Sequence, residues 1–254
     1  MRRLKVLSAL LVLGFGAVVG PGAEALRAQS PAESSRSNAD DSNASSAGPA
    51  TKAGSATKIT IARVQYGGGG DWYSDEHALP ELLAFVRRHT LLDVAPQAAT
   101  VKLSTDQVFT YPYLYLTGHG NVRFAPPEVK RLRRYLTGGG FLHIDDNYGL
   151  DKSIRRELEK VFPDKKLRLL PDDHPIYSAH FDFPGGLPKI HEHDGQAAQG
   201  FGLFSDAGRL MVFYSYESDL GDGWDPASVH DNSEATRRQA LRMGTNVLVY
   251  AMTR

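Results

Sequence analysis

More than once in this chain, a histidine lies two positions before a second residue that could bind a metal ion. His143 and Asp145 belong to an apolar segment, whereas His191 and His193 lie in a loop-rich stretch with Asp194 directly after them. On an extended backbone, residues i and i+2 face the same side, so both imidazoles of the second pair could reach one ion. Imidazole together with carboxylate suits zinc, manganese, iron or nickel. We therefore predict a divalent cation at His191, His193 and Asp194. Because no established metal motif is present, the alternative is that these side chains hold a long loop in place.

Polar residues also follow several apolar runs that are typical of buried strands. Asp71, His119, Asp145 and Glu217 each lie shortly after such a run. In open α/β sheets, ligands bind beyond the carboxyl ends of the strands, so these residues are candidates for chemistry. We predict that Asp145 is a general base or a ligand, with His119 and His193 as partners. Glu217 is predicted to orient the substrate.

Asp145 and Asp146 are adjacent carboxylates near a histidine, His143. Carboxylates that share a site have their pKa values pushed apart, which provides one acid and one base. His143 and Asp146 are therefore included among the predicted ligand-binding residues. Asp146 also has a structural alternative, in which its side chain caps the turn of residues 147–149.

Four glycines, residues 67–70, follow the first predicted strand directly. Their backbone N–H groups could contact an anion or a hydroxyl group, although neither a dinucleotide motif nor a P-loop is present. The structural alternative is a turn that needs positive φ. Trp72 offers either an apolar floor for a sugar ring or ordinary core packing. We predict that Gly68, Gly69, Asp71 and Trp72 contact a small-molecule ligand.

An acidic segment near the C-terminus contains Glu217, Asp219, Asp222 and Asp225. Its spacing differs from that of a calcium-binding EF-hand loop. We predict a solvated loop, and contact of Glu217 with a ligand is the functional alternative.

The first 57 residues do not have the composition of a folded domain. Residues 1–28 combine basic residues, a short apolar run and small residues, as a secretory signal peptide does, with cleavage after Ala25 or Ala28. Retention as an N-terminal anchor is the alternative. Residues 29–57 lack large apolar side chains and are predicted to be a disordered linker. We expect an exported protein, either periplasmic or secreted, without any other membrane span.

The composition excludes several classes of function. Cysteine is absent, which excludes disulfides, thiolate metal ligands and a cysteine nucleophile. Acidic and basic residues both number 29, so the chain lacks the basic excess of a nucleic-acid-binding protein. No oligomeric state is predicted.

Residues 58–254 have the pattern of a single α/β domain. Strands are predicted at 59–64, 101–103, 113–117, 141–144 and 210–214, and helices near 79–86, 126–136, 151–161 and 233–251. The alternation predicts a three-layer sandwich, a mostly parallel sheet with helices on both faces. The long stretch between residues 170 and 200 is predicted to be a functional insertion.

Five motifs in order resemble the bacterial family called domain of unknown function 4159. They are YGGGGDWY from Tyr66, YLTGHG from Tyr115, GGFLHIDD from Gly139, KIHEHD from Lys189 and YESDLGDGW from Tyr216. The resemblance implies a class I glutamine amidotransferase-like, flavodoxin-like fold but no established activity.

A looser resemblance is to ThuA-like (trehalose utilisation) proteins of the same fold. It involves residues 139–145, the turn Asp173-His-Pro-Ile176 and the strand residues Val212-Phe-Tyr214. It implies that Asp145 stands where the nucleophile of the fold or its replacement would be. Glutamine hydrolysis is ruled out because that reaction needs a cysteine thiolate.

These observations support two functional hypotheses. The first is a hydrolase or isomerase of a small polar, carbohydrate-derived ligand, assisted by a divalent metal. The second is a non-catalytic module for ligand binding or envelope assembly that keeps the amidotransferase-like fold without its nucleophile.

Overall fold

The structure is a computed structural model that describes residues 58–193 and 195–254. The predicted signal peptide and linker, and the predicted metal ligand Asp194, lie outside these residues. Within the described part of the chain, no helix is both long enough and apolar enough to cross a membrane.

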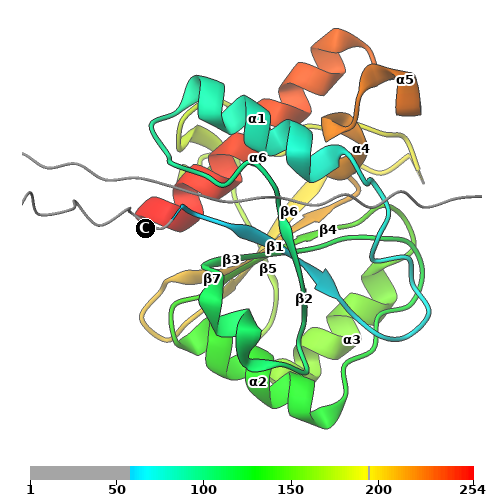
Figure 1. The fold of residues 1–254 in the computed structure, drawn as a ribbon. Helices are drawn as coiled ribbons and strands as arrows, with labels where there is room; N and C mark the ends of the chain where they lie inside the picture. Colours follow the sequence, from blue (N-terminus) through cyan, green and yellow to red (C-terminus); the bar gives the residue numbers. More distant parts are fainter. Residues whose placement is uncertain (1–57, 194) are drawn as a thin grey trace, which may run out of the picture. The chain divides into compact units, whose positions relative to one another are not determined.

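A seven-stranded sheet forms the centre of the domain, with the strand order β2-β1-β3-β4-β7-β6-β5 (Figure 1). The five strands β2, β1, β3, β4 and β7 are each parallel to their neighbours in this group. Strand β6 is antiparallel both to β7 and to β5. The chain order reverses between β1 and β3, the kind of switch point where open α/β sheets bind ligands. The strands are β1 (Ile61–Gln65), β2 (Ala99–Lys102), β3 (Tyr113–Leu116), β4 (Phe141–Asp145), β5 (Arg168–Leu169), β6 (Gln199–Phe204) and β7 (Leu210–Tyr216).

Helices cover both faces of the sheet. The α-helices are α1 (Ala78–His89), α2 (Pro126–Thr137), α3 (Asp151–Val161), α4 (Leu220–Trp224), α5 (Ala227–His230) and α6 (Glu234–Thr253), and two short 3-10 helices are η1 (Asp106–Thr110) and η2 (Pro175–Ser178). In Figure 1, α1, α4 and α6 lie above the sheet and α2 and α3 lie below it. The apolar side chains form one core cluster on each face.

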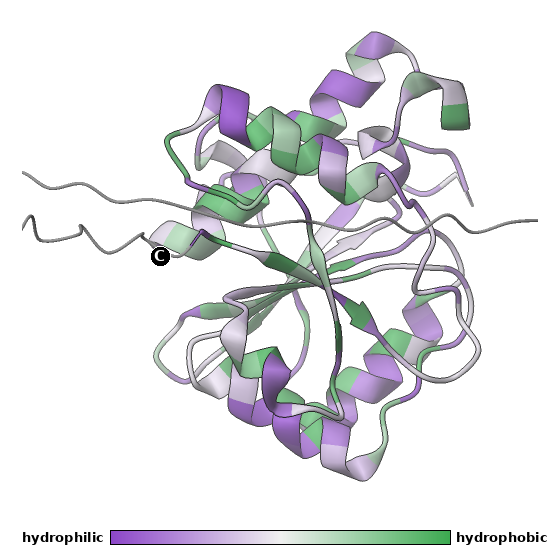
Figure 2. Cartoon of the chain, in the orientation of Figure 1, coloured by the Kyte–Doolittle hydropathy of each residue, from purple (hydrophilic) through white to green (hydrophobic). Residues whose placement is uncertain are grey.

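Strand periodicity determines which face each residue of β4 contacts. Leu142 and Ile144 pack in the cluster with α2 and α3, whereas Phe141 packs in the cluster with α1 and α6. His143 points to that second face, where its ring lies 5.9 Å from the ring of Trp224. Because successive side chains alternate, Asp145 also points toward α4. The hydropathy colouring shows the apolar residues gathered on the strands and on helix faces turned toward them (Figure 2).

The predicted fold class is confirmed at the level of a mostly parallel α/β sheet with helices on both faces. Each of the five predicted strands and four predicted helices is present within a few residues of its expected limits. The antiparallel strands β5 and β6 were not predicted, and neither were the short helices α4 and α5.

Candidate functional site

The short helix α4 begins directly beyond the carboxyl end of β7. The chain turns there through Glu217 and Asp219, which have left-handed backbone φ angles of 57° and 60°. Such angles are uncommon for residues other than glycine and often occur at functional sites. The Asp219 side chain then accepts a hydrogen bond from the Asp222 N–H, which holds the first turn of the helix.

Asp145, at the end of β4, anchors α4 to the sheet. Its two oxygens accept the backbone N–H groups of Leu220 and Gly221, at 3.3 and 2.6 Å. They also accept the hydroxyl groups of Tyr115 and Ser215. Burial raises the pKa of Asp145 to about 6, and the Ser215 and backbone hydrogen bonds partly oppose that increase. Asp145 is fully buried. It supports α4 from the interior, whereas the polar residues described next lie on and around that helix.

Histidines from the long loop before β6 meet the aspartates of α4. The Nδ1 atom of His191 lies 2.8 Å from Oδ2 of Asp222 and 3.7 Å from Oδ2 of Asp219. The Nε2 atom of His193 lies 3.0 Å from the same Asp219 oxygen. At the end of α5, Nδ1 of His230 lies 3.3 Å from the same oxygen of Asp222.

The backbone explains why His191 lies beside α4. The Ser218 carbonyl accepts the N–H groups of both Ile190 and His191, and the Ser218 hydroxyl donates to the Pro188 carbonyl. These bonds tie the loop to the turn that follows β7. The loop therefore approaches the α4 carboxylates at a fixed point rather than only through its side chains.

Ligand atoms converge in two overlapping groups, which we call the His–Asp cluster. In the first, one ligand atom each of His191, Asp219 and Asp222 lies within 4.8 Å of the others. In the second, the same holds for Asp75, Asp222 and His230. Asp222 belongs to both groups, so the cluster is continuous.

The carboxylates of the His–Asp cluster repel one another in a buried setting. Burial raises the pKa of Asp219 well above its usual value, and Asp145 and Asp75 raise it further. Burial likewise raises the pKa of Asp222, followed by the charges of Asp219 and Asp75. The pKa of His191 is lowered, first by burial and then by its histidine neighbours. These shifts favour protonated carboxyls and a neutral imidazole.

A close backbone approach at Gly221 holds Asp75 and Asp145 near α4. A Cβ atom on Gly221 would lie 2.7 Å from Oδ2 of Asp75, 2.9 Å from the Tyr115 hydroxyl and 3.2 Å from Oδ2 of Asp145. No real Cβ makes the shortest of these contacts without movement of a neighbour. Glycine at this position therefore lets three polar groups reach the helix, one from the loop between β1 and α1 and one each from β3 and β4.

Three predicted site residues, His143, His119 and Asp71, lie outside the His–Asp cluster. His143 is fully buried and contacts the Tyr113 hydroxyl and Ser215 Oγ, both at 3.0 Å, and burial lowers its pKa to about 3. His119 is exposed and pairs through Nδ1 with Oδ2 of Asp71 at 3.0 Å. The structure therefore joins His191 and His193 with Asp219, but it does not bring His119 or His143 into the His–Asp cluster.

Glu217 pairs with a lysine of the loop that precedes β6. Its carboxylate is buried and pairs with Nζ of Lys189 at 2.8 Å. The predicted solvated acidic loop was wrong, because Glu217, Asp219, Asp222 and Asp225 are all buried. The reason is that α4 docks against α1 and α6 through Trp224, which is fully enclosed, and so carries its carboxylates inward.

The glycine-rich turn after β1 has a structural explanation in its own geometry. Gly68 and Gly69 both have positive φ, and a Cβ on Gly68 would lie 2.6 Å from the Asn121 carbonyl oxygen. Trp72 is half-buried against the α2–α3 core cluster.

Asp146 caps the turn predicted for it, since Oδ1 accepts the N–H groups of Tyr148 and Leu150 at 3.1 and 3.0 Å.

Sequence reasoning missed Asp75 and His230 and treated Asp222 only as part of a solvated loop. Asp75 lies three residues after Trp72, and its position depends on a φ of 55° that the sequence does not reveal. Asp219 and Asp222 are three residues apart, the spacing of neighbours on one helix face. That spacing was the one signal available, and Gly221 and Gly223 lower the helix propensity of the same segment.

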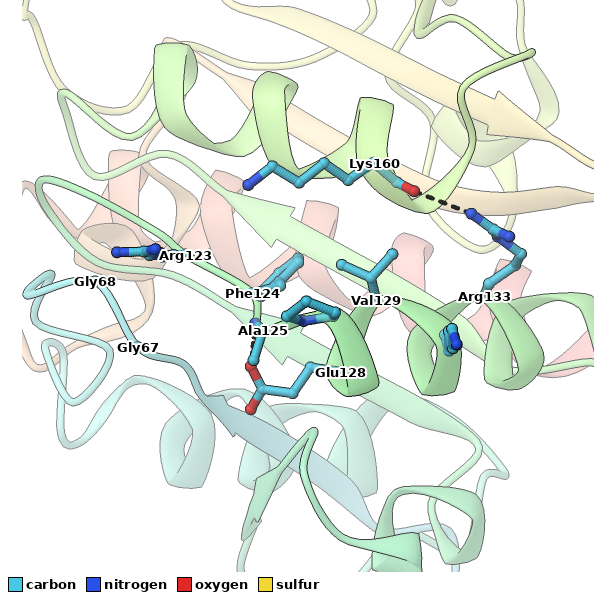
Figure 3. Close-up of a pocket in the computed structure, with 11 residues that line it drawn as sticks. Gly67, Gly68, Arg123, Phe124, Ala125, Glu128, Val129, Arg133 and Lys160 are labelled. Atoms are coloured by element: carbon cyan, nitrogen blue, oxygen red, sulfur yellow. Dashed lines mark hydrogen bonds between the residues drawn. The ribbon is translucent and has the colours of Figure 1, made fainter.

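A separate pocket of about 750 Å³ lies beside the start of α2 (Figure 3). Gly67, Arg123, Val129 and Lys160 are among its lining residues, and Glu128 accepts the Ala125 N–H at its edge. None of its lining residues belongs to the His–Asp cluster, so the pocket and the cluster are distinct features.

Comparison with known families identifies the chain. The model of the family described as Domain of unknown function (DUF4159) matches residues 60–252, and the chain belongs to this family. No curated protein matches the sequence.

Proposed function

We propose that this member of the DUF4159 family is a metal-dependent hydrolase of a small polar, carbohydrate-derived substrate. One observation carries the proposal: ligand atoms of His191, Asp219 and Asp222 lie within 4.8 Å of one another, although they come from two separate segments. The backbone bonds at Ser218 support this convergence independently of the side chains.

The ligand set suits a catalytic rather than a purely structural ion. One imidazole and two carboxylates provide three protein ligands, which leaves a coordination position open for water. These nitrogen and oxygen donors are compatible with zinc, manganese, iron or nickel. A bound ion of this kind lowers the pKa of its water and so supplies a nucleophile at neutral pH.

We assign the proton transfer to His193. Its Nε2 contacts Oδ2 of Asp219 at 3.0 Å, and the ring stacks on Tyr148 with centroids 5.1 Å apart. In the proposed reaction, His193 accepts a proton from water as the water oxygen bonds to the electrophilic atom of the substrate. The bond to the leaving group then breaks, and His193 returns the proton to that group.

Other residues act on the site indirectly. Asp145 holds the N–H groups at the start of α4 and thereby positions Asp219 and Asp222. Lys189 and Glu217 form a buried pair that fixes the loop carrying His191. The exposed ring of Tyr73, two residues before Asp75, supports a sugar-like substrate because such rings stack on aromatic side chains.

We also propose the fold and location that the resemblance implies. The parallel strands β2-β1-β3-β4-β7 follow the order 2-1-3-4-5 of flavodoxin-like sheets, which supports a class I glutamine amidotransferase-like fold. Asp145 takes the place of the missing nucleophile. The basic and apolar N-terminal residues support export to the periplasm or the medium.

Metal titration of the full chain tests the proposal. Wild type, H191A and the matched surface variant H180A are each stripped with a chelator and titrated with Zn²⁺ and Mn²⁺ by calorimetry. We expect H180A to bind like wild type and H191A to lose at least tenfold in affinity. If wild type binds neither ion, or if H191A binds as tightly as wild type, the metalloenzyme proposal fails. A metal-binding protein that hydrolyses no ester, phosphoester or glycoside would instead be a non-catalytic module.

A further inference from the structure

We propose that the His–Asp cluster holds two divalent cations bridged by the Asp222 carboxylate. The second ion would be bound by Asp75 and His230, and this inference rests on the proposed function for the first. Asp75, Asp222 and His230 each offer one ligand atom within 4.8 Å of the others, as the first group does. Asp222 is the only residue common to both groups.

One of the two histidine contacts to Asp222 has the separation of ligands that share an ion, and the other has that of a hydrogen bond. Two ligands that each lie about 2.1 Å from a tetrahedral ion are about 3.4 Å apart. The Nδ1 atoms of His191 and His230 lie 2.8 and 3.3 Å from Oδ2 of Asp222, and the two imidazole rings have centroids 5.8 Å apart. The two histidines therefore flank one carboxylate, as the terminal ligands of neighbouring ions do in two-metal sites with a separation of about 3.5–4 Å.

Asp225 provides an independent observation at the second position. It is 2 % exposed, and its Oδ2 lies 3.2 Å from Nε2 of His230. A carboxylate on the far nitrogen of a histidine is the usual support for a metal-ligating imidazole, and here it directs Nδ1 toward Asp222. The other oxygen, Oδ1, is buried without a hydrogen-bond partner among the described residues. This buried oxygen is therefore left for a donor or a cation that the described residues do not supply.

Asp75 is held in place before any ion binds. Its backbone is in the left-handed region, and Nη2 of Arg63 donates to its carbonyl at 2.8 Å. The Asn147 amide donates to Oδ2 of its carboxylate, and Thr117 in turn contacts Asn147. Arg63 in β1 thus holds the backbone of Asp75, and residues that follow β3 and β4 hold its carboxylate, and such support is typical of preorganised ligands.

Charge balance also favours two ions over one. Asp75, Asp219, Asp222 and Asp225 form no ion pair with lysine or arginine in the described part of the chain; the pairs that exist are with histidines. Two dications would match the charge of all four carboxylates in their ionised form, whereas one ion would leave the others either protonated or buried without a cation. The second ion would also help to bind the attacking and leaving oxygens in the hydrolysis.

Stoichiometry and spin coupling of Mn²⁺ test the inference. The full chain is freed of metal and titrated with Mn²⁺ alone, with metal content measured per chain and the electron paramagnetic resonance spectrum recorded at each step. We expect two ions per wild-type chain and loss of the resolved hyperfine signal of isolated Mn²⁺ as the second ion binds. H230Q and D75N should bind a single uncoupled ion, and H180A should behave like wild type.

The outcomes separate this inference from the proposed function. A single uncoupled ion in wild type overturns the second site and leaves the first intact, whereas no bound ion overturns both. Two coupled ions in H230Q and D75N would also overturn the assignment of the second site. Circular dichroism and thermal unfolding of each variant establish that it is folded, and H230N serves if H230Q is not.

Discussion

The backbone N–H of Gly221 donates to Oδ2 of Asp145 at 2.6 Å, which joins the end of β4 to the start of α4. Because Asp219 and Asp222 flank this contact in sequence, the position of the proposed metal ligands depends on a buried carboxylate that is not itself a ligand. The link also explains why the chain needs an acceptor at the end of β4, where the resemblance to amidotransferase-like proteins implies a nucleophile.

Replacement of Asp145 tests this link. The D145N side chain has the same shape as aspartate, but one of its two oxygens becomes an NH₂ group. Both oxygens of Asp145 accept hydrogen bonds, so the NH₂ group would face a donor and at least one buried hydrogen bond would be lost. We expect D145N to lower the free energy of unfolding by about 1–3 kcal/mol in urea titrations. It should also weaken Mn²⁺ binding. The exposed D206N is the matched control, and a D145N protein with unchanged stability and affinity would show that Asp145 does not position α4.

Gly221 allows a second test of the same region. The Cβ of G221A would lie 2.7 Å from Oδ2 of Asp75, so the carboxylate or the helix must move. We expect a loss of about 1–3 kcal/mol in stability and weaker Mn²⁺ binding, because overpacking a filled site displaces its groups. G185A is the control, since a Cβ on Gly185 has nothing within 4 Å. Equal metal affinities for the two variants would contradict the described packing around α4.

His143 makes stability depend on pH. Its pKa is about 3 in the folded protein and 6.5 when unperturbed, because burial disfavours the charged ring. The unfolded chain therefore binds the proton more readily, and the stability contributed by neutral His143 is present above pH 6.5 and lost as the pH falls toward 3.

The variant H143Q removes this titration while keeping hydrogen-bonding groups near Tyr113 and Ser215. We expect wild type to exceed H143Q in stability at pH 7 and the difference to shrink steadily in urea titrations at lower pH. Asp145 acts in the opposite direction, since its pKa is raised to about 6, but its contribution is common to both proteins. A difference that stays constant from pH 7 to pH 4 would contradict the burial of His143.

Metal binding should release protons. Burial and mutual repulsion raise the pKa values of Asp219 and Asp222, so the metal-free protein retains protons that a cation displaces. Mn²⁺ affinity should therefore increase as the pH rises, and calorimetry in buffers of different ionisation enthalpy should detect the released protons. In the metal-free protein, the same raised pKa values lower stability as the pH rises above the usual carboxyl value of 3.8. Binding with no proton release at any pH would contradict this coupling.

The sequence predicted the regular layers of the fold well. The helix predicted near 79–86 is α1, and its periodically spaced apolar residues Leu79, Leu82, Leu83 and Val86 are all buried. The last helix was predicted to begin near residue 233, and the Ser233 side chain caps it by accepting the Thr236 N–H. Such features depend on local periodicity and capping, which a single sequence displays directly.

The site was less predictable because it depends on contacts between distant segments. His191 and His193 were singled out by their spacing, but their partners Asp219 and Asp222 follow from the docking of a five-residue helix that contains two glycines. The position of Asp75 depends on its own left-handed backbone conformation and on its contact with the buried Arg63. His143 drew attention by its residue type, whereas strand alternation turned it into the core beside Trp224.

X-ray absorption spectroscopy of the zinc-loaded full chain tests the central claim most directly. The account predicts nitrogen and oxygen neighbours at about 2.0–2.2 Å, with imidazole scattering that is reduced in H191A. It also predicts that H180A leaves the spectrum unchanged. A spectrum without imidazole scattering, or one that H191A does not alter, would contradict a metal site at His191, Asp219 and Asp222.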